Sequence, residues 1–309
     1  MTMANAEIRV DADTRATLMR RATYASVAVA TVLIAAKIVA WVLTDSVSVL
    51  SSLLDSLLDV AASLVNLVAV RHALEPADDE HRFGHGKAEA VAGLVQSAFI
   101  AGSALLLFSE AVHRLWSPVP VENGAVGIGV MALSMALTFV LVQYQKYVVR
   151  RTGSVAVGAD RLHYMSDFML NGGVALSLVA SIWLDARIVD PVCGLAIGVW
   201  ILRGAWTIGR DSLDHLMDRE LPDDTRTRIV AIARAHPDIK DVHDLRTRAN
   251  GSSIHVQLHL EMDGALTLLR AHAAADAVEA AIETAFPGAD VIVHMDPDNV
   301  VERARVPAA

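Results

Sequence analysis

Six long apolar stretches constrain the fold of this chain more than any other feature of its sequence. They cover residues 20–43, 46–70, 88–115, 124–149, 155–184 and 187–208. Each is near or above the roughly 20 residues that a helix needs to cross a bilayer. Hydrophobic residues make up 54% of the chain, more than is usual for a soluble protein. The sequence therefore predicts a polytopic α-helical membrane protein, with six transmembrane helices in residues 1–208.

The basic residues indicate how these helices are oriented. Lys and Arg gather before the first span, between the second and third spans, and between the fourth and fifth, whereas the other three connections hold only Arg187. Basic connections stay on the cytoplasmic side of a membrane. We therefore expect a multi-pass protein with both termini cytoplasmic and a short cytoplasmic segment, 1–18, at its start. That polar, acid-containing start also lacks the features of a signal peptide.

Residues 209–309 have the shorter, more polar pattern of a soluble domain. Helices are predicted at 223–235 and 266–286, and strands at 242–249, 253–262 and 289–295. The order αββαβ is typical of a small α+β domain with helices on one face of a sheet. The net charge of the whole chain is −9, so nucleic acid is not an expected partner.

Two predicted spans carry acidic or imidazole side chains four residues apart. Asp55 and Asp59 lie in the second span, and His163 and Asp167 lie in the fifth. Residues four apart share one helix face, so each pair can act as a two-pronged ligand. A carboxylate at the centre of a bilayer costs roughly 2.5–3.5 kcal/mol. These side chains therefore indicate a metal or proton path inside the membrane.

The donor types favour a divalent metal of the zinc class. Three carboxylates and one imidazole suit zinc, held tetrahedrally by nitrogen and oxygen, while iron(II), cadmium, cobalt and manganese could use the same ligands. The imidazole makes calcium and magnesium less favoured. The single Cys193 lies in an apolar span and excludes a disulfide framework and a thiolate cluster. A proton relay without metal, or polar residues satisfied by neighbouring helices, are the alternatives.

The motifs SLLDSLLD, HYMSD, HRFGHGKAE, DLRTR and VIVHMDP resemble those of the cation diffusion facilitator family, in particular its bacterial zinc and ferrous-iron efflux branch. The resemblance extends from the first span to about residue 298. It implies a homodimer in the bacterial inner membrane, whose cytoplasmic domains have a metallochaperone-like fold and pair with each other.

The resemblance also implies where metal binds. The transport site would comprise Asp55, Asp59, His163 and Asp167. A loop site between the second and third spans would comprise Asp78, His81 and His85, although the residues alone leave open whether this loop binds zinc or is simply solvated. A binuclear site in the cytoplasmic domain would comprise His243, His259, His272, His294 and Asp296. An ion pair at the hinge between the domains would comprise Lys87 and Asp218.

The function predicted from these features is exchange of cytoplasmic zinc, or a similar divalent cation, for external protons by alternating access. No GxxxxGK[ST] motif is present, so ATP is not the expected energy source. Two other functions compete with transport. One is an intramembrane metalloenzyme, which the lack of an HExxH motif disfavours, and the other is a metal sensor whose cytoplasmic domain signals without flux.

Overall fold

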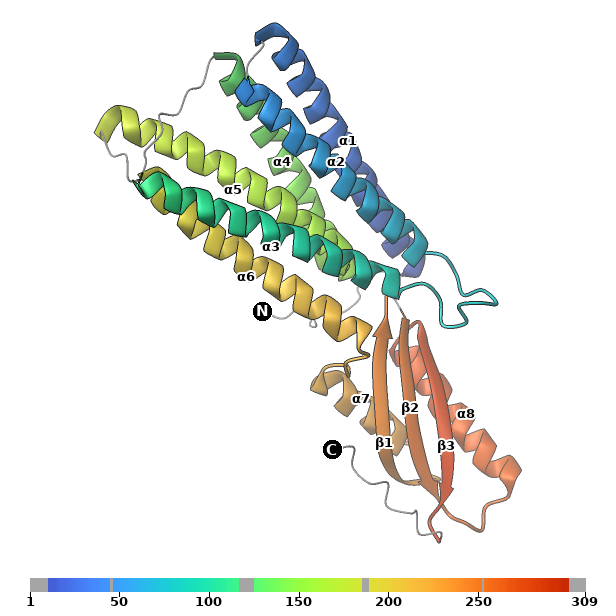
Figure 1. Ribbon diagram of the computed structural model, residues 1–309. Coiled ribbons are helices and arrows are strands. Elements are labelled where there is room, and N and C mark those ends of the chain that lie inside the picture. The colour runs from blue at the N-terminus through green and yellow to red at the C-terminus, as the bar shows by residue number, and fades with distance from the viewer. Residues whose placement is uncertain (1–10, 45–46, 117–124, 185–188, 252, 300–309) are drawn as a thin grey trace. The chain divides into compact units, whose positions relative to one another are not determined.

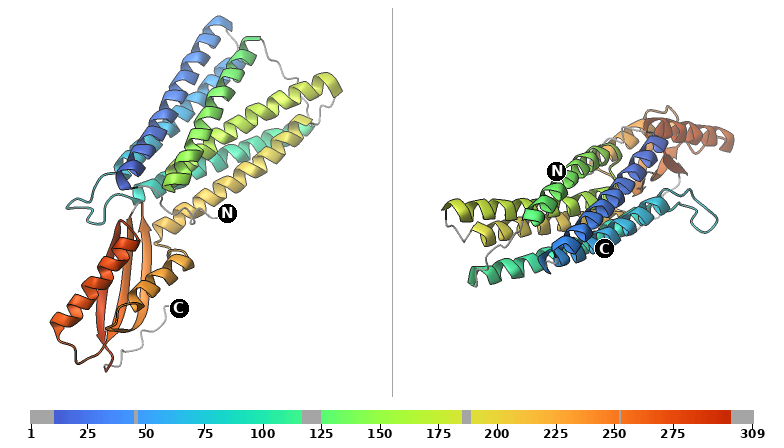
Figure 2. Two further views of the ribbon diagram at one scale, coloured as in Figure 1. Left: turned by 180° about the vertical axis from the view of Figure 1, so that it is seen from behind. Right: turned by 90° about the horizontal axis from the view of Figure 1, so that it is seen from above.

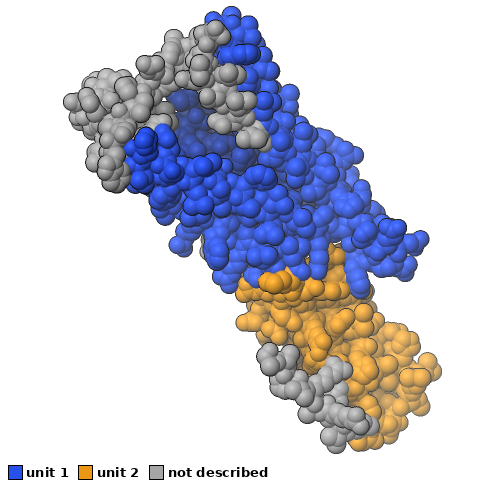
Figure 3. Space-filling view, viewed as in Figure 1, with its two compact units in different colours: residues 1–216 blue, residues 217–309 orange. Residues whose placement is uncertain are grey.

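The computed structural model describes residues 11–44, 47–116, 125–184, 189–251 and 253–299, except for a few side chains in these ranges. The chain divides into two compact units, Met1–Leu216 and Met217–Ala309 (Figure 3). The fold class predicted from the sequence is confirmed: a helical membrane unit is followed by a small α+β unit.

The described residues of the first unit form six long helices. They are α1 (Ala12–Thr44), α2 (Val47–Ala73), α3 (Lys87–Trp116), α4 (Ala125–Thr152), α5 (Val155–Leu184) and α6 (Val189–Leu216). Within the described residues, the segments Asp13–Leu43, Lys87–His113 and Val192–Leu216 are each long and apolar enough to cross a membrane. The other three helices correspond closely to the remaining predicted spans.

The helix α6 continues past the predicted domain boundary at residue 208. It ends at Leu216, where the first compact unit also ends. Its polar last turns pack on α3 through small residues, because a Cβ added to Gly93 would come 2.6 Å from the Oγ of Ser212. The hydropathy of this segment decreases before the helix ends. The sequence pattern therefore placed the domain boundary too early.

The six helices form two groups. The helix α1 packs against α2 and α4, whereas α3 packs mainly against α6 and α5 also packs against α6. Figures 1 and 2 show α1, α2 and α4 on one side of the unit and α3, α5 and α6 on the other. The groups diverge toward the end where α1 connects to α2. They meet mainly through contacts of α5 with α4 and of α2 with α3.

A buried arginine joins three helices at the opposite end of this unit. Arg15 of α1 is buried, and its Nε donates to the carbonyl oxygen of Thr152 at 2.9 Å. Its guanidinium also lies 3.9 Å from the carboxylate of Glu89, which is buried too. A buried charge is stable only when partners replace its water. Arg15 thus connects the start of α1 to the end of α4 and the start of α3.

The described residues of the second unit form two helices and a three-stranded sheet. Along the chain these are α7 (Asp223–Arg234), β1 (Ile239–Asn250), β2 (Ser253–Met262), α8 (Leu268–Ala285) and β3 (Ala289–Pro297). The strand β2 is central, antiparallel to β1 and parallel to β3. Both helices cover one face of the sheet (Figures 1 and 2).

Alternation along β2 divides the sheet into an apolar and a histidine-bearing face. Val256, Leu258 and Leu260 are buried in a core that includes Ile229 of α7 and Ile282 of α8. The residues between them project from the opposite face, because side chains of a strand alternate. The core thus fixes which face of the sheet carries the histidines of β2.

We predict that Leu258→Ala destabilises the second unit by about 2–5 kcal/mol, since it removes a fully buried core side chain. Hydrogen exchange of the backbone amides in residues 217–299 of the full-length protein should become faster. Leu268→Ala is the control, because Leu268 is 78% exposed, and it should leave the exchange almost unchanged. Equal exchange rates in both variants would contradict this description of the core.

Candidate metal centres

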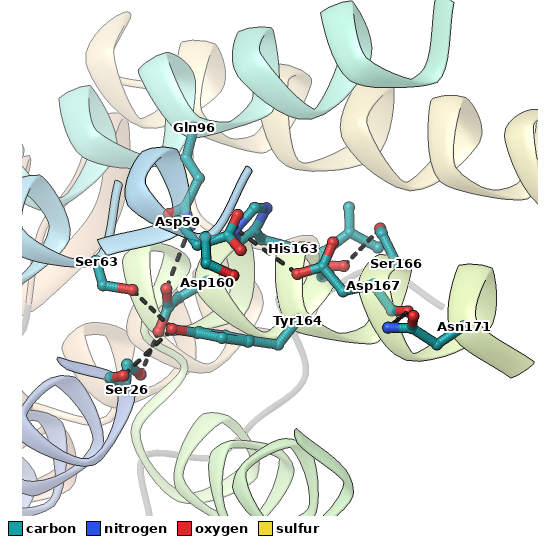
Figure 4. A network of polar contacts seen from close by, with 12 residues as sticks. Ser26, Asp59, Ser63, Gln96, Asp160, His163, Tyr164, Ser166, Asp167 and Asn171 are labelled. Atoms are coloured by element: carbon teal, nitrogen blue, oxygen red, sulfur yellow. Dashed lines mark hydrogen bonds and ion pairs between the residues drawn. The ribbon is translucent and has the colours of Figure 1, made fainter. Parts of the chain in front are cut away.

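Two helices bring three of the four predicted transport-site residues together. The Nε2 of His163, on α5, lies 3.1 Å from Asp59 Oδ1 on α2 and 3.9 Å from Asp167 Oδ2 on its own helix. One ligand atom from each of these residues lies within 4.8 Å of the others. Figure 4 shows His163 between the two carboxylates. One ring nitrogen therefore faces acidic groups from both helix groups.

The fourth residue, Asp55, belongs to α2, one turn before Asp59, and its side chain lies outside the described residues. Helix geometry alone places it on the same face as Asp59. Its role as a ligand therefore stays a prediction.

The cluster is neither sealed nor fully open to solvent. The side chains of Asp59, His163 and Asp167 are 25%, 19% and 34% exposed. One turn beyond Asp167 on the same helix, Asn171 Nδ2 donates to the carbonyl oxygen of Asp167 at 2.9 Å. Carboxylate and imidazole donors at these separations can close on one divalent ion, whose ligand distances are near 2 Å for zinc.

A second acidic residue of α5, Asp160, is fully buried one turn before His163. Its carboxylate accepts hydrogen bonds from Ser26 Oγ at 2.5 Å, from Gln145 Nε2 at 2.7 Å and from Gln96 Nε2 at 3.3 Å. These three donors come from α1, α4 and α3. Asp160 therefore connects both helix groups.

Tyr164 extends this network to α2. Its hydroxyl lies 2.9 Å from the hydroxyl of Ser63 and donates to the carbonyl oxygen of Ser26 at 3.2 Å. Tyr164 is buried, and its ring meets the edge of the His163 ring with centroids 5.5 Å apart. Figure 4 shows the network beside the cluster of Asp59, His163 and Asp167. Within the described residues, α1, α2, α3, α4 and α5 thus each contribute a side chain to one polar junction.

Asp160 is not among the predicted site residues, although the sequence carries a signal for it. Asp160, His163 and Asp167 are spaced i, i+3 and i+7, a spacing that puts all three on one helix face. A spacing of four residues, which predicted the site, relates only His163 and Asp167.

We predict that Asp160→Ala lowers the thermal stability of the detergent-solubilised protein. It would leave three buried donors without their acceptor, at a cost of about 1–3 kcal/mol for each donor that finds no other partner. Asp160→Asn should lose less, because the amide keeps one acceptor oxygen. Asp167→Ala is the control on the same helix, since Asp167 is partly exposed. A melting temperature equally affected by Asp160→Ala and Asp167→Ala would contradict the network's structural role.

The predicted loop site is assembled between α2 and α3. Asp78 lies 3.4 Å from both His81 Nδ1 and His85 Nε2. The backbone N–H groups of His81 and Glu80 donate to Asp78 Oδ1 at 2.6 and 3.0 Å. These hydrogen bonds hold the pKa of Asp78 below its ordinary value, and the bond from the His81 N–H has the largest effect. The carboxylate is thus ionised and fixed beside the two imidazoles.

Three neighbouring strands place histidines in a row across the sheet. In the strand registers, His259 of β2 is opposite His243 of β1 and His294 of β3. Asp296 of β3 lies 2.6 Å from His259 Nδ1, 3.4 Å from His243 Nε2 and 3.1 Å from His294 Nε2. The structure therefore brings together four of the five predicted tail ligands, with three histidines around the carboxylate of Asp296.

The fifth predicted tail ligand is located elsewhere in this unit. His272 is on α8, and its Nδ1 lies 3.3 Å from Asp276 on the same helix. Within the described residues, the close group of donors on the sheet comprises His243, His259 and Asp296, without His272. Its participation in a binuclear site stays a prediction.

The two residues of the predicted hinge pair belong to different units. Lys87 Nζ donates to the carbonyl oxygen of Leu216 at 3.4 Å in the first unit. The carboxylate of Asp218 lies 3.5 Å from Arg248 in the second. The pairing of Lys87 with Asp218 therefore stays a prediction.

Comparison with known families accounts for both units. Residues 23–217 match the model of the cation efflux transmembrane domain, and residues 221–298 match that of the cation efflux protein, cytoplasmic domain. This chain belongs to the cation diffusion facilitator family. The resemblance seen in the sequence motifs is thus confirmed, and the family places the chain among membrane transporters rather than enzymes.

Relatives in this family are similar over almost their whole length. The chain is 49% identical over 290 residues to the cation-efflux pump FieF of Serratia proteamaculans, covering 94% of this chain and 96% of the pump. It is 50% identical over 286 residues to FieF of Cronobacter sakazakii, covering 93% and 95%. A solved zinc form of the transporter CzrB is 33% identical, with a TM-score of 0.26, and covers 28% of this chain and 99% of that one.

Proposed function

We propose that this protein exports zinc, or a similar divalent cation, from the cytoplasm in exchange for protons. The observation that carries the proposal is the cluster of Asp59, His163 and Asp167 between α2 and α5. Its donors match a borderline divalent metal, and membership in a cation efflux family supports transport as the activity. Asp55 completes the transport site in this proposal.

The position of the cluster supports alternating access. Asp59 belongs to the group of α1, α2 and α4, whereas His163 and Asp167 belong to the group of α3, α5 and α6 (Figure 1). A site shared by two helix groups is exposed to one side or the other when the groups rock against each other. The bound ion then crosses the membrane without a continuous pore.

Competition between metal and protons supplies the coupling. Metal binding requires unprotonated carboxylates and a neutral imidazole, so it releases protons. The three carboxylates of the site left bare in hydrocarbon would cost roughly 8–10 kcal/mol together on insertion scales. Either a divalent ion or protons removes most of that cost. The empty site therefore returns across the membrane in its protonated form.

Zinc is the first choice of cargo, and iron(II), cadmium, cobalt and manganese are alternatives with the same ligand chemistry. In this proposal the protein is a homodimer in the bacterial inner membrane, with both termini cytoplasmic. The sheet cluster of His243, His259, His294 and Asp296 binds zinc in the cytoplasm and favours pairing of the tails, because the metal offsets repulsion between acidic domains.

The transport site is tested by replacing one ligand at a time. Asp59→Ala and Asp167→Ala should each abolish uptake of radioactive zinc into inside-out vesicles, because the three remaining ligands no longer complete the tetrahedral site and lack one of its carboxylates. Glu110→Ala, a change of an exposed carboxylate elsewhere in α3, is the control and should retain uptake. Undiminished uptake by Asp167→Ala would overturn the assignment of this site.

The tail cluster is tested by zinc stoichiometry. The variant His243→Ala/His259→Ala should bind fewer zinc ions per chain in equilibrium dialysis and should show weaker association of the tails. His255→Ala is the matched control, because His255 lies on the same strand but pairs with Asp290 at 2.9 Å. An unchanged stoichiometry in the double variant would exclude a zinc site on the sheet.

A further inference from the structure

The loop between α2 and α3 holds more metal-binding side chains than the three that define the predicted loop site. His72 is in the last turn of α2, and its Nδ1 lies 2.7 Å from the carboxylate of Glu75. One ligand atom from each of His72, Glu75 and His85 lies within 4.8 Å of the others, and the same holds for Asp78, His81 and His85. The loop thus contains two sets of three donors.

His85 belongs to both sets and lies between them. Its ring centroid is 4.5 Å from that of His72 and 4.5 Å from that of His81. The residue is 8% exposed, whereas His72 and Glu75 are exposed. The two sets therefore share the buried imidazole of His85 and differ in their solvent-exposed side chains.

The buried ring of His85 has an unused ligand atom. Its Nε2 faces Asp78 at 3.4 Å, while its Nδ1 is buried and has no hydrogen-bond partner among the described residues. A buried polar atom without a partner destabilises a fold. When the ring proton is on Nε2 and is directed at Asp78, Nδ1 carries a free lone pair. A neutral imidazole binds metal through such a lone pair.

Backbone hydrogen bonds hold both sets in place without metal. The N–H of Glu75 donates to His72 O at 3.0 Å, and the N–H of Gly84 donates to His81 O at 2.8 Å. Gly84 has a φ of 80°, a conformation that glycine adopts without strain. The tight turns keep five donor side chains within one short stretch of chain.

We propose that His72, Glu75 and His85 form a second binding position for a zinc-like ion, which competes with the position at Asp78, His81 and His85. A neutral imidazole offers one lone pair, so the loop holds one ion at a time and exchanges it between the two sets. Two imidazoles and a carboxylate are a ligand set that zinc accepts, with a further place left for water. The inference rests on the proposed loop site.

Zinc binding to the loop is measured in the full-length protein in detergent, against a chromophoric chelator. The background His163→Ala/Asp167→Ala/His243→Ala/His259→Ala removes the other two centres. In it, the intact loop should bind one zinc. Asp78→Asn/His81→Ala should still bind one zinc, with an affinity at least about tenfold lower. Even the loss of a residue that only hydrogen-bonds to a metal ligand can lower metal affinity by that factor. Adding His72→Ala/Glu75→Gln to that variant should abolish the binding.

A matched control separates ligation from a general charge effect. Glu80→Gln removes a carboxylate from the same loop, and the structure uses only the backbone N–H of Glu80 in this site. Added to Asp78→Asn/His81→Ala in place of His72→Ala/Glu75→Gln, it should leave the remaining zinc bound. Circular dichroism of each variant confirms that the helices are retained.

Three outcomes would overturn the inference. They are loss of all loop zinc in Asp78→Asn/His81→Ala, retention of that zinc after His72→Ala/Glu75→Gln is added, and two zinc ions bound by the intact loop. The proposed transport function is tested by flux in vesicles with the transport site intact, so its failure is distinguishable from a failure of loop binding.

Discussion

The structure of the membrane unit depends on one buried carboxylate, that of Asp160. Three helices contribute donors to it, through Ser26, Gln96 and Gln145. A buried carboxylate is tolerated only where hydrogen bonds replace its water, so these side chains and the helices that carry them are held in a fixed relation. Asp160 lies one turn from His163, so the same packing also positions the candidate metal cluster of Asp59, His163 and Asp167.

This arrangement places the candidate site where the two helix groups meet. The junction joins the two helix groups, while toward the end that carries the α1–α2 connection the groups diverge (Figures 1 and 2). Away from this junction, the ion pair of Arg15 with Glu89 also joins the two groups, at the end of the unit where α1 begins. Asp59 belongs to one helix group and His163 and Asp167 belong to the other, and the three side chains meet beside the junction.

Sequence reasoning predicted those features that depend on local periodicity. Hydropathy located the six helices, alternation in β2 placed His255 and His259 on one face, and the spacing of His163 and Asp167 predicted their common face. It missed features that depend on which helices become neighbours. The donors to Asp160 come from residues 26, 96 and 145, which no local pattern relates, and the meeting of His72 with His85 depends on a turn between them. The polar end of α6 was not predicted as helix, because a hydropathy pattern does not reveal that Ser212 packs on Gly93.

The central claim is that one site is occupied by metal and protons in turn. The most direct test uses proteoliposomes that contain the purified protein and an internal pH-sensitive dye, with a zinc gradient imposed and a pump-free, unbuffered interior. Movement of zinc inward should be accompanied by movement of protons outward, seen as internal alkalinisation that stops when zinc is chelated. Zinc movement with no opposing proton movement would contradict the account.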